Sequence, residues 1–263
     1  MAEPIFQVSD LRVEVPDMTR KPLFGAAPRL EILKGVSFAI ARGAVLGIVG
    51  GSGSGKTTLG RTLVRLIEPS AGRLVFDGQD IAHLSDADMR RLRPRIQMIF
   101  QDPMSSLNPR LTVGRTIAAP LGARTGDARV KAALEQVGLP ADFARRYPHE
   151  LSGGQRQRVG IARAIAMRPD FILADEIVSG LDVSSQAQVL MLLEELVARL
   201  GLTLVFISHD LSVIRRLCSR VIVLRSGEIV EDAATADLFE RPRHPYTREL
   251  LDAIPIPDPS IRW

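Results

Sequence analysis

A strand-like run, Val45–Val49, leads straight into residues 50–57, which read GGSGSGKT, and a helix-like run from Lys56 to Ile67 follows. The loop fits the pattern G-x-x-x-x-G-K-[ST], and a strand before it and a helix after it are the context that the pattern requires. Its glycines let several backbone N–H groups point into one hollow, and the first turn of the helix adds a partial positive charge. The sequence therefore predicts a binding site for a polyphosphate.

Two side chains of this loop can act on a bound nucleotide. Lys56 supplies a mobile positive charge for the β- and γ-phosphates, and the Thr57 hydroxyl can bind Mg²⁺. The alternative is an ordinary turn rich in glycine and serine, but a chance match in a chain of this length is on the order of 1%. The residues expected to contact the nucleotide here are Gly50, Gly51, Ser52, Gly53, Ser54, Gly55, Lys56, Thr57 and Thr58.

Two acidic residues end another strand-like run. Asp175 and Glu176 follow the apolar segment Phe171–Ala174, and parallel α/β sheets bind ligands at the carboxyl ends of their strands. There Asp175 can hold Mg²⁺ through a coordinated water, while Glu176, on the other side of the strand, can polarise a water that attacks the γ-phosphate. Without a phosphate loop, two solvated acids would be the better interpretation; beside one, we expect both to be functional.

Segments rich in β-branched and aliphatic residues alternate with longer helix-like segments, which is typical of an α/β protein with a mainly parallel sheet. Prolines and a glycine predict a loop over Val15–Leu30, and Gly227 predicts a late hairpin. Residues 102–147 show turn residues, then short amphipathic helices and no strand, so we expect a helical insertion. The predicted strands are Ile5–Val15, Glu31–Ile40, Val45–Val49, Arg73–Phe76, Ile96–Phe100, Phe171–Ala174, Thr203–Ile207 and Val221–Leu224. The predicted helices include Lys56–Ile67, Ala128–Val137, Gln155–Met167, Ser184–Leu200 and Leu211–Arg216.

Composition narrows the class further. The 263 residues are 46% apolar and 24% charged, which indicates a globular protein with enough chain to bury a core. The 34 basic and 30 acidic residues leave a net charge of +4, which is weak support for a nucleic-acid partner. A single cysteine excludes a disulfide framework, and no run of about 18 apolar residues or signal-peptide pattern occurs. We therefore expect a cytosolic chain that reaches any membrane through a partner.

A second glycine-rich helix start lies about a hundred residues further on. Leu151-Ser152-Gly153-Gly154-Gln155 opens a predicted helix, so a serine hydroxyl and two glycine amides can bind an anion there. A serine-capped helix start is the simpler interpretation. The five residues match the signature of the ATP-binding subunits of ABC transporters, which this sequence resembles. The resemblance implies a head-to-tail pair, in which each ATP, with its Mg²⁺, lies between the phosphate loop of one chain and the signature of the other.

Three further residues match motifs of that family. Gln101 follows Ile96–Phe100 and matches the Q-loop glutamine, which implies a contact with Mg²⁺ or the attacking water. Ser179-Gly180-Leu181-Asp182 resembles the D-loop, which implies that Asp182 lies at the nucleotide. His209 matches the switch histidine that contacts the γ-phosphate. The resemblance thus assigns hydrolysis to Glu176, His209 and Gln101. Outside the family, Gln101 would be an ordinary polar strand end and His209 a structural histidine.

Two stretches point to one branch of the family, the oligopeptide/dipeptide and nickel importers. Residues 100–110 read FQDPMSSLNPR, and residues 244–251 read HPYTRELL. The resemblance implies an ATPase that drives uptake of small peptides, or alternatively of nickel, through two transmembrane permease subunits fed by an extracytoplasmic solute-binding protein. It also implies a second ATP-binding subunit, either the same chain or a sister ATPase, and a peripheral location at the cytoplasmic face of the inner membrane.

The resemblance covers roughly Phe6 to Pro255 and implies the fold of a P-loop NTPase. In that fold a mainly parallel core sheet is accompanied by an N-terminal antiparallel β region and a helical insertion. We therefore expect residues 1–263 to form one ATP-binding domain, with the helical subdomain at about 102–168.

The sequence departs from the family pattern in three places. Val15 stands where the family places an aromatic residue that stacks on adenine, and Phe24 is the possible substitute. Ile177 replaces the proline after the two acids, which we expect to leave the carboxylates in place but to free the backbone beyond them. The chain also ends soon after the His244 motif. The second and third departures resemble the nickel members.

Other functions remain as alternatives. An ABC ATPase that acts on ribosomes or DNA would usually carry two cassettes or a long coiled coil, and neither is present in this sequence. A degenerate partner would bind ATP without hydrolysing it, yet Lys56, Asp175, Glu176 and His209 are all in place. An exporter is disfavoured by the two branch-specific stretches. ATPase activity of the purified chain, alone and with its partner, separates the degenerate case from the others.

Overall fold

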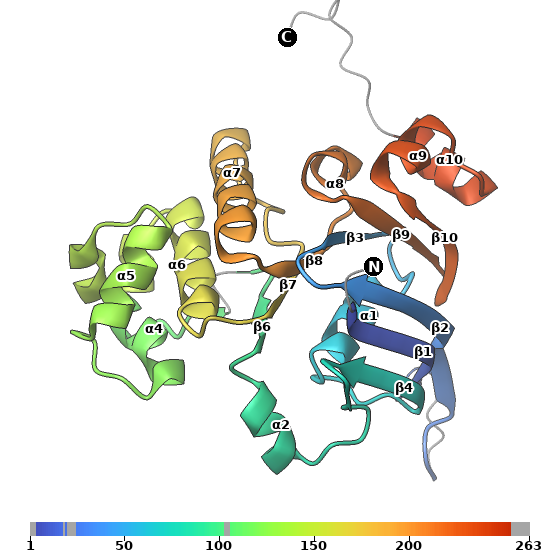
Figure 1. Cartoon of the computed structure of the whole chain (residues 1–263), viewed down its shortest axis with the longest axis horizontal. Coiled ribbons are helices and arrows are strands. Elements are labelled where there is room, and N and C mark those ends of the chain that lie inside the picture. The colour runs from blue at the N-terminus through green and yellow to red at the C-terminus, as the bar shows by residue number, and fades with distance from the viewer. Residues whose placement is uncertain (1–3, 18, 20–24, 103–105, 254–263) are drawn as a thin grey trace, which may run out of the picture.

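Two β-sheets and a group of helices make up the computed structural model, which describes residues 4–17, 19, 25–102 and 106–253 (Figure 1). A six-stranded sheet runs in the order β10-β9-β3-β8-β7-β6, and a four-stranded sheet in the order β2-β1-β4-β5. In the larger sheet β9, β3, β8, β7 and β6 pair in parallel, and β10 pairs antiparallel with β9. The predicted α/β class, with a mainly parallel core sheet and an N-terminal antiparallel region, is confirmed.

The larger sheet brings the candidate site residues to one edge. Its strands are β3 (Val45–Val49), β6 (Ile96–Ile99), β7 (Phe171–Asp175), β8 (Thr203–Ile207), β9 (Arg220–Arg225) and β10 (Glu228–Ala234). Every residue of β7 and β8 is buried, as expected for parallel strands covered on both faces. The carboxyl ends of β3, β6, β7 and β8 lead directly to Gly50, Gln101, Glu176 and His209, which therefore meet at the same edge.

The antiparallel sheet packs against the parallel one through aromatic side chains. Its strands are β1 (Pro4–Pro16), β2 (Arg29–Ala41), β4 (Ala71–Phe76) and β5 (Gln79–Asp80). The Phe6 ring of β1 lies 5.0 Å from the Phe76 ring and 4.7 Å from the Phe171 ring of β7, centroid to centroid. Such pairs add about 0.5–1.5 kcal/mol beyond their burial, so the three rings fasten the two sheets together. The strands extend to Pro16 and start at Arg29, so the predicted loop over Val15–Leu30 is shorter than expected.

Helix α1 (Lys56–Leu63) begins at the phosphate loop and ends earlier than the predicted Ile67. Arg65 has a φ of +52°, in the left-handed region, so the helix cannot continue through it. Within α1, a Cβ at Gly60 would lie only 2.7 Å from the Ile207 Cδ1 atom of β8. The missing side chain therefore lets α1 lie close against the sheet and keeps the phosphate loop at its edge.

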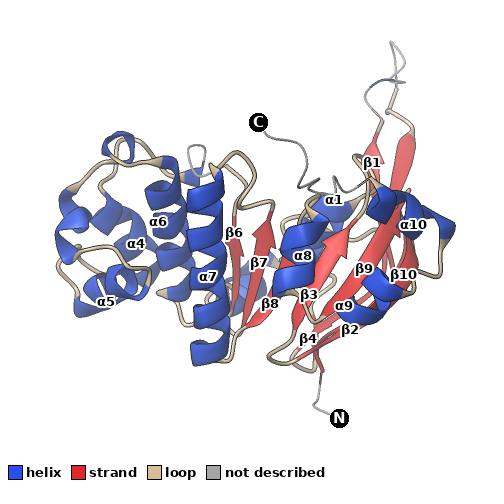
Figure 2. Cartoon of the chain, turned by 90° about the horizontal axis from the view of Figure 1, so that it is seen from above, coloured by secondary structure: helices blue, strands red, loops and turns tan. Residues whose placement is uncertain are grey.

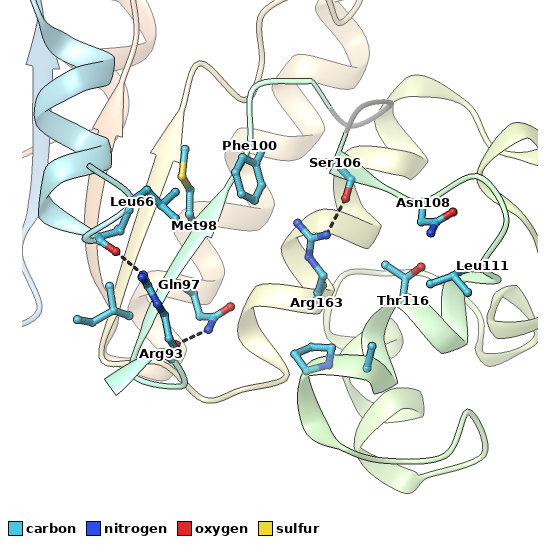
Figure 3. Close-up of a pocket in the computed structure, with 14 residues that line it drawn as sticks. Leu66, Arg93, Gln97, Met98, Phe100, Ser106, Asn108, Leu111, Thr116 and Arg163 are labelled. Carbon is cyan, nitrogen blue, oxygen red and sulfur yellow. Dashed lines mark hydrogen bonds between the residues drawn. The ribbon is translucent and has the colours of Figure 1, made fainter. Parts of the chain in front are cut away.

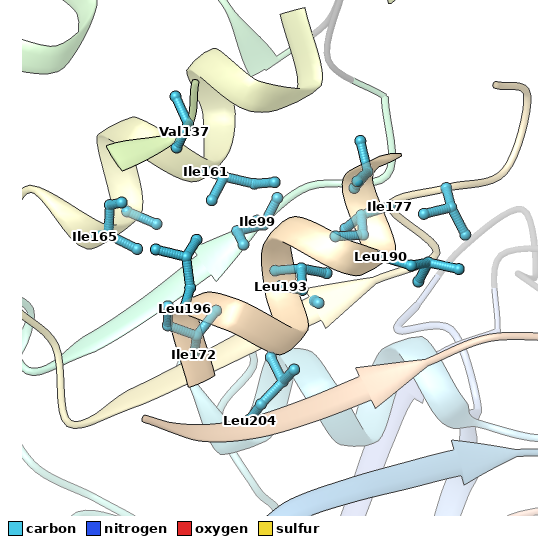
Figure 4. Close-up of a cluster of buried hydrophobic side chains, with 14 of the residues drawn as sticks. Ile99, Val137, Ile161, Ile165, Ile172, Ile177, Leu190, Leu193, Leu196 and Leu204 are labelled. Carbon is cyan, nitrogen blue, oxygen red and sulfur yellow. The ribbon is translucent and has the colours of Figure 1, made fainter. Parts of the chain in front are cut away.

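The described residues between β6 and β7 form helices and turns only, as predicted for the insertion. They comprise α4 (Val113–Leu121), α5 (Ala128–Gln136), the 3₁₀ turns Ala141–Arg145 and Pro148–Glu150, and α6 (Gly153–Ile165), which together we call the helical lobe. The lobe lies on the side of the molecule away from the antiparallel sheet (Figure 1). Helix α7 (Val183–Leu200) runs beside α6 (Figure 2). Ile161 of α6, Leu193 of α7 and Ile172 of β7 share one buried cluster, which joins the lobe to the sheet (Figure 4).

The last part of the described chain folds back along the sheet. It contains α8 (Leu211–Leu217), the β9–β10 hairpin, α9 (Thr235–Glu240) and α10 (Pro245–Asp252). The predicted hairpin is confirmed, with Ser226 and Gly227 at φ values of +48° and +85°. Three short helices, α9, α10 and α2 (Asp86–Leu92), were not among the helices predicted from the sequence. Among the described residues, none of the helices has the length and apolar character needed to span a membrane.

Candidate nucleotide site

The phosphate loop connects the end of β3 to the start of α1, as the sequence predicts. Gly50 has a φ of +151°, which favours glycine, and a Cβ there would overlap the carbonyl oxygen of Leu224 on β9. Gly55 has a φ of +102° and forms the N-terminal cap of α1. Conformation and close packing thus explain both glycines, and the loop passes tightly over the neighbouring strand.

The Lys56 amine is buried and bonds within the loop. Its Nζ donates to the carbonyl oxygens of Gly50 at 2.8 Å and Gly51 at 2.9 Å. Burial lowers the pKa of Lys56, while the nearby carboxylates of Glu176 and Asp175 act in the opposite direction. Charged phosphate oxygens would bind the ammonium more strongly than these neutral carbonyl oxygens do. We therefore expect the Lys56 amine to leave the two carbonyls when a phosphate binds.

Thr57 and Asp175 lie together beside the loop. The Thr57 hydroxyl donates to Asp175 Oδ1 at 3.4 Å, and Asp175 is 2% exposed. Burial raises the pKa of the Asp175 carboxyl, although the positive charge of Arg61 and other contacts partly offset the shift. A hydroxyl and a buried carboxylate are ligands that Mg²⁺ prefers, and a cation here would favour the ionised carboxylate, so the two residues fit the expected metal.

Protein groups would supply only part of such a coordination shell. Within the described ranges, no group of three or more His, Cys, Asp or Glu residues is placed to hold a metal. Phosphate oxygens and water would have to provide the remaining ligands, which is the usual arrangement for Mg²⁺ at a nucleotide. Gln101, the third predicted ligand, instead directs its side-chain amide at a carboxylate.

That carboxylate belongs to Glu176, at the centre of three predicted catalytic residues. Gln101 Nε2 donates to Glu176 Oε2 at 3.0 Å, and His209 Nδ1 lies 3.5 Å from Glu176 Oε1. The His209 side chain is 65% exposed and the Glu176 side chain 20% exposed. The structure therefore brings together residues from the ends of β6, β7 and β8, with the glutamate in contact with both neighbours.

The backbone at Glu176 is unusual for its residue type. Its φ is +49°, in the left-handed region, where residues other than glycine are uncommon. The Glu176 amide donates to the Ile207 carbonyl at 2.9 Å, and the Ser179 hydroxyl donates to the Glu176 carbonyl at 2.7 Å. Ile177 is 1% exposed and packs into the cluster of Figure 4. These contacts tie the start of the segment to β8 and the core, and the expected freedom of the backbone beyond Ile177 stays a prediction.

The signature opens α6 with a reciprocal cap. Gln155 N donates to Ser152 Oγ at 3.2 Å, and Ser152 N donates to Gln155 Oε1 at 3.0 Å. Both side chains therefore first serve the helix start, while the amides of the first turn remain directed along its axis. Among the described residues, no hydrogen bond or ion pair joins the signature to the phosphate loop.

The D-loop-like segment lies directly against the signature. Cβ atoms at Gly153 and Gly154 would lie 3.4 Å from Leu181 Cδ2 and 3.1 Å from Ser185 Oγ. Asp182 caps α7, with Oδ1 accepting from Ser185 N at 2.9 Å and Oδ2 from the Ser185 hydroxyl at 2.7 Å. Those hydrogen bonds lower the pKa of Asp182. In this chain Asp182 is thus a helix cap, and its contact with a nucleotide stays a prediction.

The adenine site is less well defined. The Val15 side chain is partly buried and packs against the apolar cluster beneath the antiparallel sheet. Phe24, the possible substitute, lies outside the described residues. The stacking partner of the base therefore stays a prediction.

One neighbour of the loop was not found from sequence. The Tyr246 hydroxyl of α10 accepts a hydrogen bond from Gly51 N at 2.7 Å. Tyr246 lies in the HPYT motif that the sequence singled out for its family resemblance, but no local pattern connects it to a loop 195 residues away.

Comparison with known proteins decides the family. A family model described as ABC transporter matches residues 33–179, more than half of the chain. The chain belongs to this family. It is an ABC ATPase, and the predicted family, fold class and ATP hydrolysis are confirmed. A second model, described as the C-terminal region of oligopeptide/dipeptide transporters, matches residues 230–263 of the ABC ATPase.

Individual relatives agree with this assignment. A putative peptide import ATP-binding protein of Brucella ovis is 59% identical over 89% of this ABC ATPase and 75% of its own length. The oligopeptide transport ATP-binding protein AppF of Bacillus subtilis is 47% identical over 97% and 79% of the two chains. A dimeric structure of the ATP-binding cassette MJ0796 bound to ADP and phosphate matches with a TM-score of 0.76 and 30% identity, covering 88% and 98%.

The Glu176 geometry yields a first prediction. In Glu176→Gln the amide cannot accept a proton, so ATP should still bind while hydrolysis falls about 10²–10⁴-fold and an ATP-bound dimer accumulates. ATPase assays and size-exclusion chromatography with ATP measure both effects. Glu228→Gln, at an exposed position of β10, is the control. Hydrolysis at the wild-type rate would remove Glu176 from the role of base.

Proposed function

We propose that this ABC ATPase is the motor subunit of an importer and couples ATP hydrolysis to the uptake of small peptides. The match of residues 230–263 to the C-terminal region of oligopeptide/dipeptide transporters carries the proposal. The names of the Brucella and Bacillus relatives support it. The solute is chosen by partner subunits, so nickel uptake, the alternative within the same branch, is decided by measuring transport.

Hydrolysis would use the residues at the edge of the parallel sheet. The loop amides and Lys56 would bind the β- and γ-phosphates, with the amine leaving the carbonyls of Gly50 and Gly51. Mg²⁺ held by Thr57 and Asp175 would supply charge neutralisation at the phosphates. Glu176 would leave Gln101, accept a hydrogen bond from water and orient that water in line with the γ-phosphate, while the neighbouring His209 would contact the γ-phosphate.

A second chain completes the proposed site. Within one chain, no hydrogen bond or ion pair of the described residues joins the signature to the phosphate loop. The backbone amides at the start of α6 could nevertheless bind an anion. A head-to-tail pair would place each signature on the nucleotide of its partner, and the MJ0796 cassette that this chain resembles is described as dimeric. The partner is a second copy or a sister ATPase. ATP binding would close the pair, and hydrolysis would let it open.

A groove between the sheet and the helical lobe is the proposed docking place of a permease subunit. It has a volume of about 520 Å³ and is lined from four sides by β6, α4, α6 and the segment after α1 (Figure 3). Leu66 is 53% exposed and Phe100 39% exposed within it. Arg163 spans the groove: its guanidinium lies over the Phe100 ring at 5.7 Å and donates to the Ser106 carbonyl at 2.8 Å.

The groove also suggests how nucleotide and membrane are coupled. Phe100 is followed at once by Gln101, which donates a hydrogen bond to Glu176. A partner that contacts Phe100 would therefore lie next to a residue that contacts the proposed general base. Contact with the permease would place the chain peripherally at the cytoplasmic face of the inner membrane. An extracytoplasmic solute-binding protein would act on it only through the permease, and we propose no nucleic-acid partner. We propose that residues 1–263 form one ATP-binding domain, in which the lobe, at about 102–168, is the helical subdomain that transmits the motion.

Transport itself tests the function. Cells carrying Lys56→Ala in this chain should lose uptake of labelled di- and tripeptides to background and keep nickel uptake, because loss of the phosphate-binding charge stops the motor. Lys34→Ala, at an exposed position of β2, is the matched control. Loss of nickel uptake with normal peptide uptake would transfer the chain to the nickel importers.

The shared site is tested at the signature. Ser152→Arg should abolish ATP-dependent dimerisation of the Glu176→Gln protein and leave ATP affinity of the monomer within about twofold, because the arginine would block only the partner's nucleotide. Loss of the serine cap costs about 1 kcal/mol, so thermal unfolding is recorded alongside. Ser9→Arg, exposed on β1, is the control. Equal loss of monomer affinity would contradict a signature that acts across the interface.

The groove is tested by charge. Leu66→Glu should reduce peptide uptake at least tenfold and leave the ATPase activity of the isolated chain unchanged. Docking of the permease would bury the new carboxylate without a group of opposite charge to pair with it. Leu30→Glu places the same charge at a residue with 49% exposure outside the groove. Unaltered uptake in both variants would place the permease elsewhere.

A further inference from the structure

Helix α10, near the end of the described chain, contacts the phosphate loop at Gly51. Gly51 N donates to the Tyr246 hydroxyl at 2.7 Å, while the Gly51 carbonyl accepts from Lys56 Nζ at 2.9 Å and from Ser54 N at 3.3 Å. The peptide units on both sides of Gly51 therefore connect Tyr246, the Lys56 amine and the turn of the phosphate loop. Any shift of Gly51 would change the resting position of Lys56.

Space, and not backbone conformation, explains the glycine at position 51. Unlike Gly50, Gly53 and Gly55, Gly51 does not have a φ in the left-handed region. A Cβ at Gly51 would lie 2.8 Å from the Tyr246 hydroxyl, closer than real Cβ contacts come. The pattern of the phosphate loop leaves this position free to be any residue, so here the tyrosine accounts for the absence of a side chain.

Tyr246 is itself held on two sides. The Arg225 guanidinium of β9 lies over its ring, 4.7 Å from the centroid, and the Tyr246 amide donates to His244 Nδ1 at 3.1 Å. These contacts fix both the ring and the start of α10. The Tyr246 hydroxyl therefore faces Gly51 from a side chain that is held by contacts with β9 and with the start of α10.

The support continues to a buried carboxylate on β10. Glu231 accepts from the amides of Arg243 and His244 at 2.9 and 3.0 Å and from the Thr247 hydroxyl at 2.6 Å. Burial alone would raise the pKa of Glu231, but these three hydrogen bonds outweigh it and lower the pKa. An ionised carboxylate thus anchors the turn before α10 to the β9–β10 hairpin, and the hairpin is part of the parallel sheet that carries the phosphate loop.

We propose that Tyr246 is a positioning residue for the phosphate loop: its hydroxyl holds the Gly51 amide so that the loop stays shaped for the β- and γ-phosphates. The C-terminal segment matched to the oligopeptide/dipeptide transporters thereby becomes part of the nucleotide site. The proposal rests on the ATPase activity of the chain and not on the identity of the transported solute.

A double-mutant cycle on the full chain tests the contact. Tyr246→Phe removes one hydroxyl and should raise the Kd for ATP about 2–10-fold, the size expected for one lost hydrogen bond, with a smaller change in kcat. Gly51→Ala in the wild-type background should raise the Kd by tenfold or more, because the new methyl group meets the hydroxyl. In the Tyr246→Phe background the same alanine should cost less than threefold, since the clash is gone.

Binding of ATP with Mg²⁺ to the purified chain is measured by calorimetry, with kcat and KM from steady-state hydrolysis and thermal unfolding as a check on folding. Tyr147→Phe removes the hydroxyl of the other tyrosine, which is outside the site, and should change nothing. An unchanged Kd in Tyr246→Phe, or an equal penalty for Gly51→Ala in both backgrounds, overturns the proposal. A peptide-transport failure with the cycle intact would count against the solute assignment alone.

Discussion

The parallel arrangement of β3, β6, β7 and β8 is the constraint on which the site depends. Neighbouring parallel strands end at one edge, so four segments far apart in the sequence deliver their polar groups to a single place. Most residues of these strands are buried, and the polar groups of the site lie at the carboxyl end of each strand or within two residues of it. Phe6, Phe76 and Phe171 then fasten the antiparallel sheet behind this edge, and Gly60 allows α1 to lie close against it.

Electrostatics at that edge describe a site arranged to receive both phosphate and a cation. The Lys56 amine is buried and bound to neutral carbonyls, and burial lowers its pKa. The Asp175 carboxyl is buried too, and burial raises its pKa. Burial therefore disfavours the charged form of both groups. A bound phosphate would offset this effect at Lys56, and a bound cation would offset it at Asp175. Glu176 likewise has partners on both sides, since it accepts a hydrogen bond from Gln101 and lies 3.5 Å from His209.

Much of this was predictable from sequence because it is local. The apolar strands, the loop pattern and the acids at the end of β7 all follow from residues within a few positions of each other. The end of α1 was misjudged because the left-handed Arg65 leaves no sequence signature, and α2, α9 and α10 were missed because a helix of six to eight residues shows its period only weakly. The contact of Tyr246 with Gly51 depends on how the whole sheet folds, so no pattern could reveal it. The role of the signature depends on another chain and stays a prediction.

The packing of Gly153 and Gly154 against Leu181 and Ser185 has a mechanical consequence for a head-to-tail pair. Residues 176–182 begin at the predicted general base and end against the helix start of the signature, which in such a pair would lie at the nucleotide of the partner. Because neither glycine carries a side chain, the backbone of the signature packs directly against Leu181 and Ser185. In the proposed pair, a movement of Glu176 in one site would reach the nucleotide of the other site through residues 177–182, so the two sites would be mechanically connected.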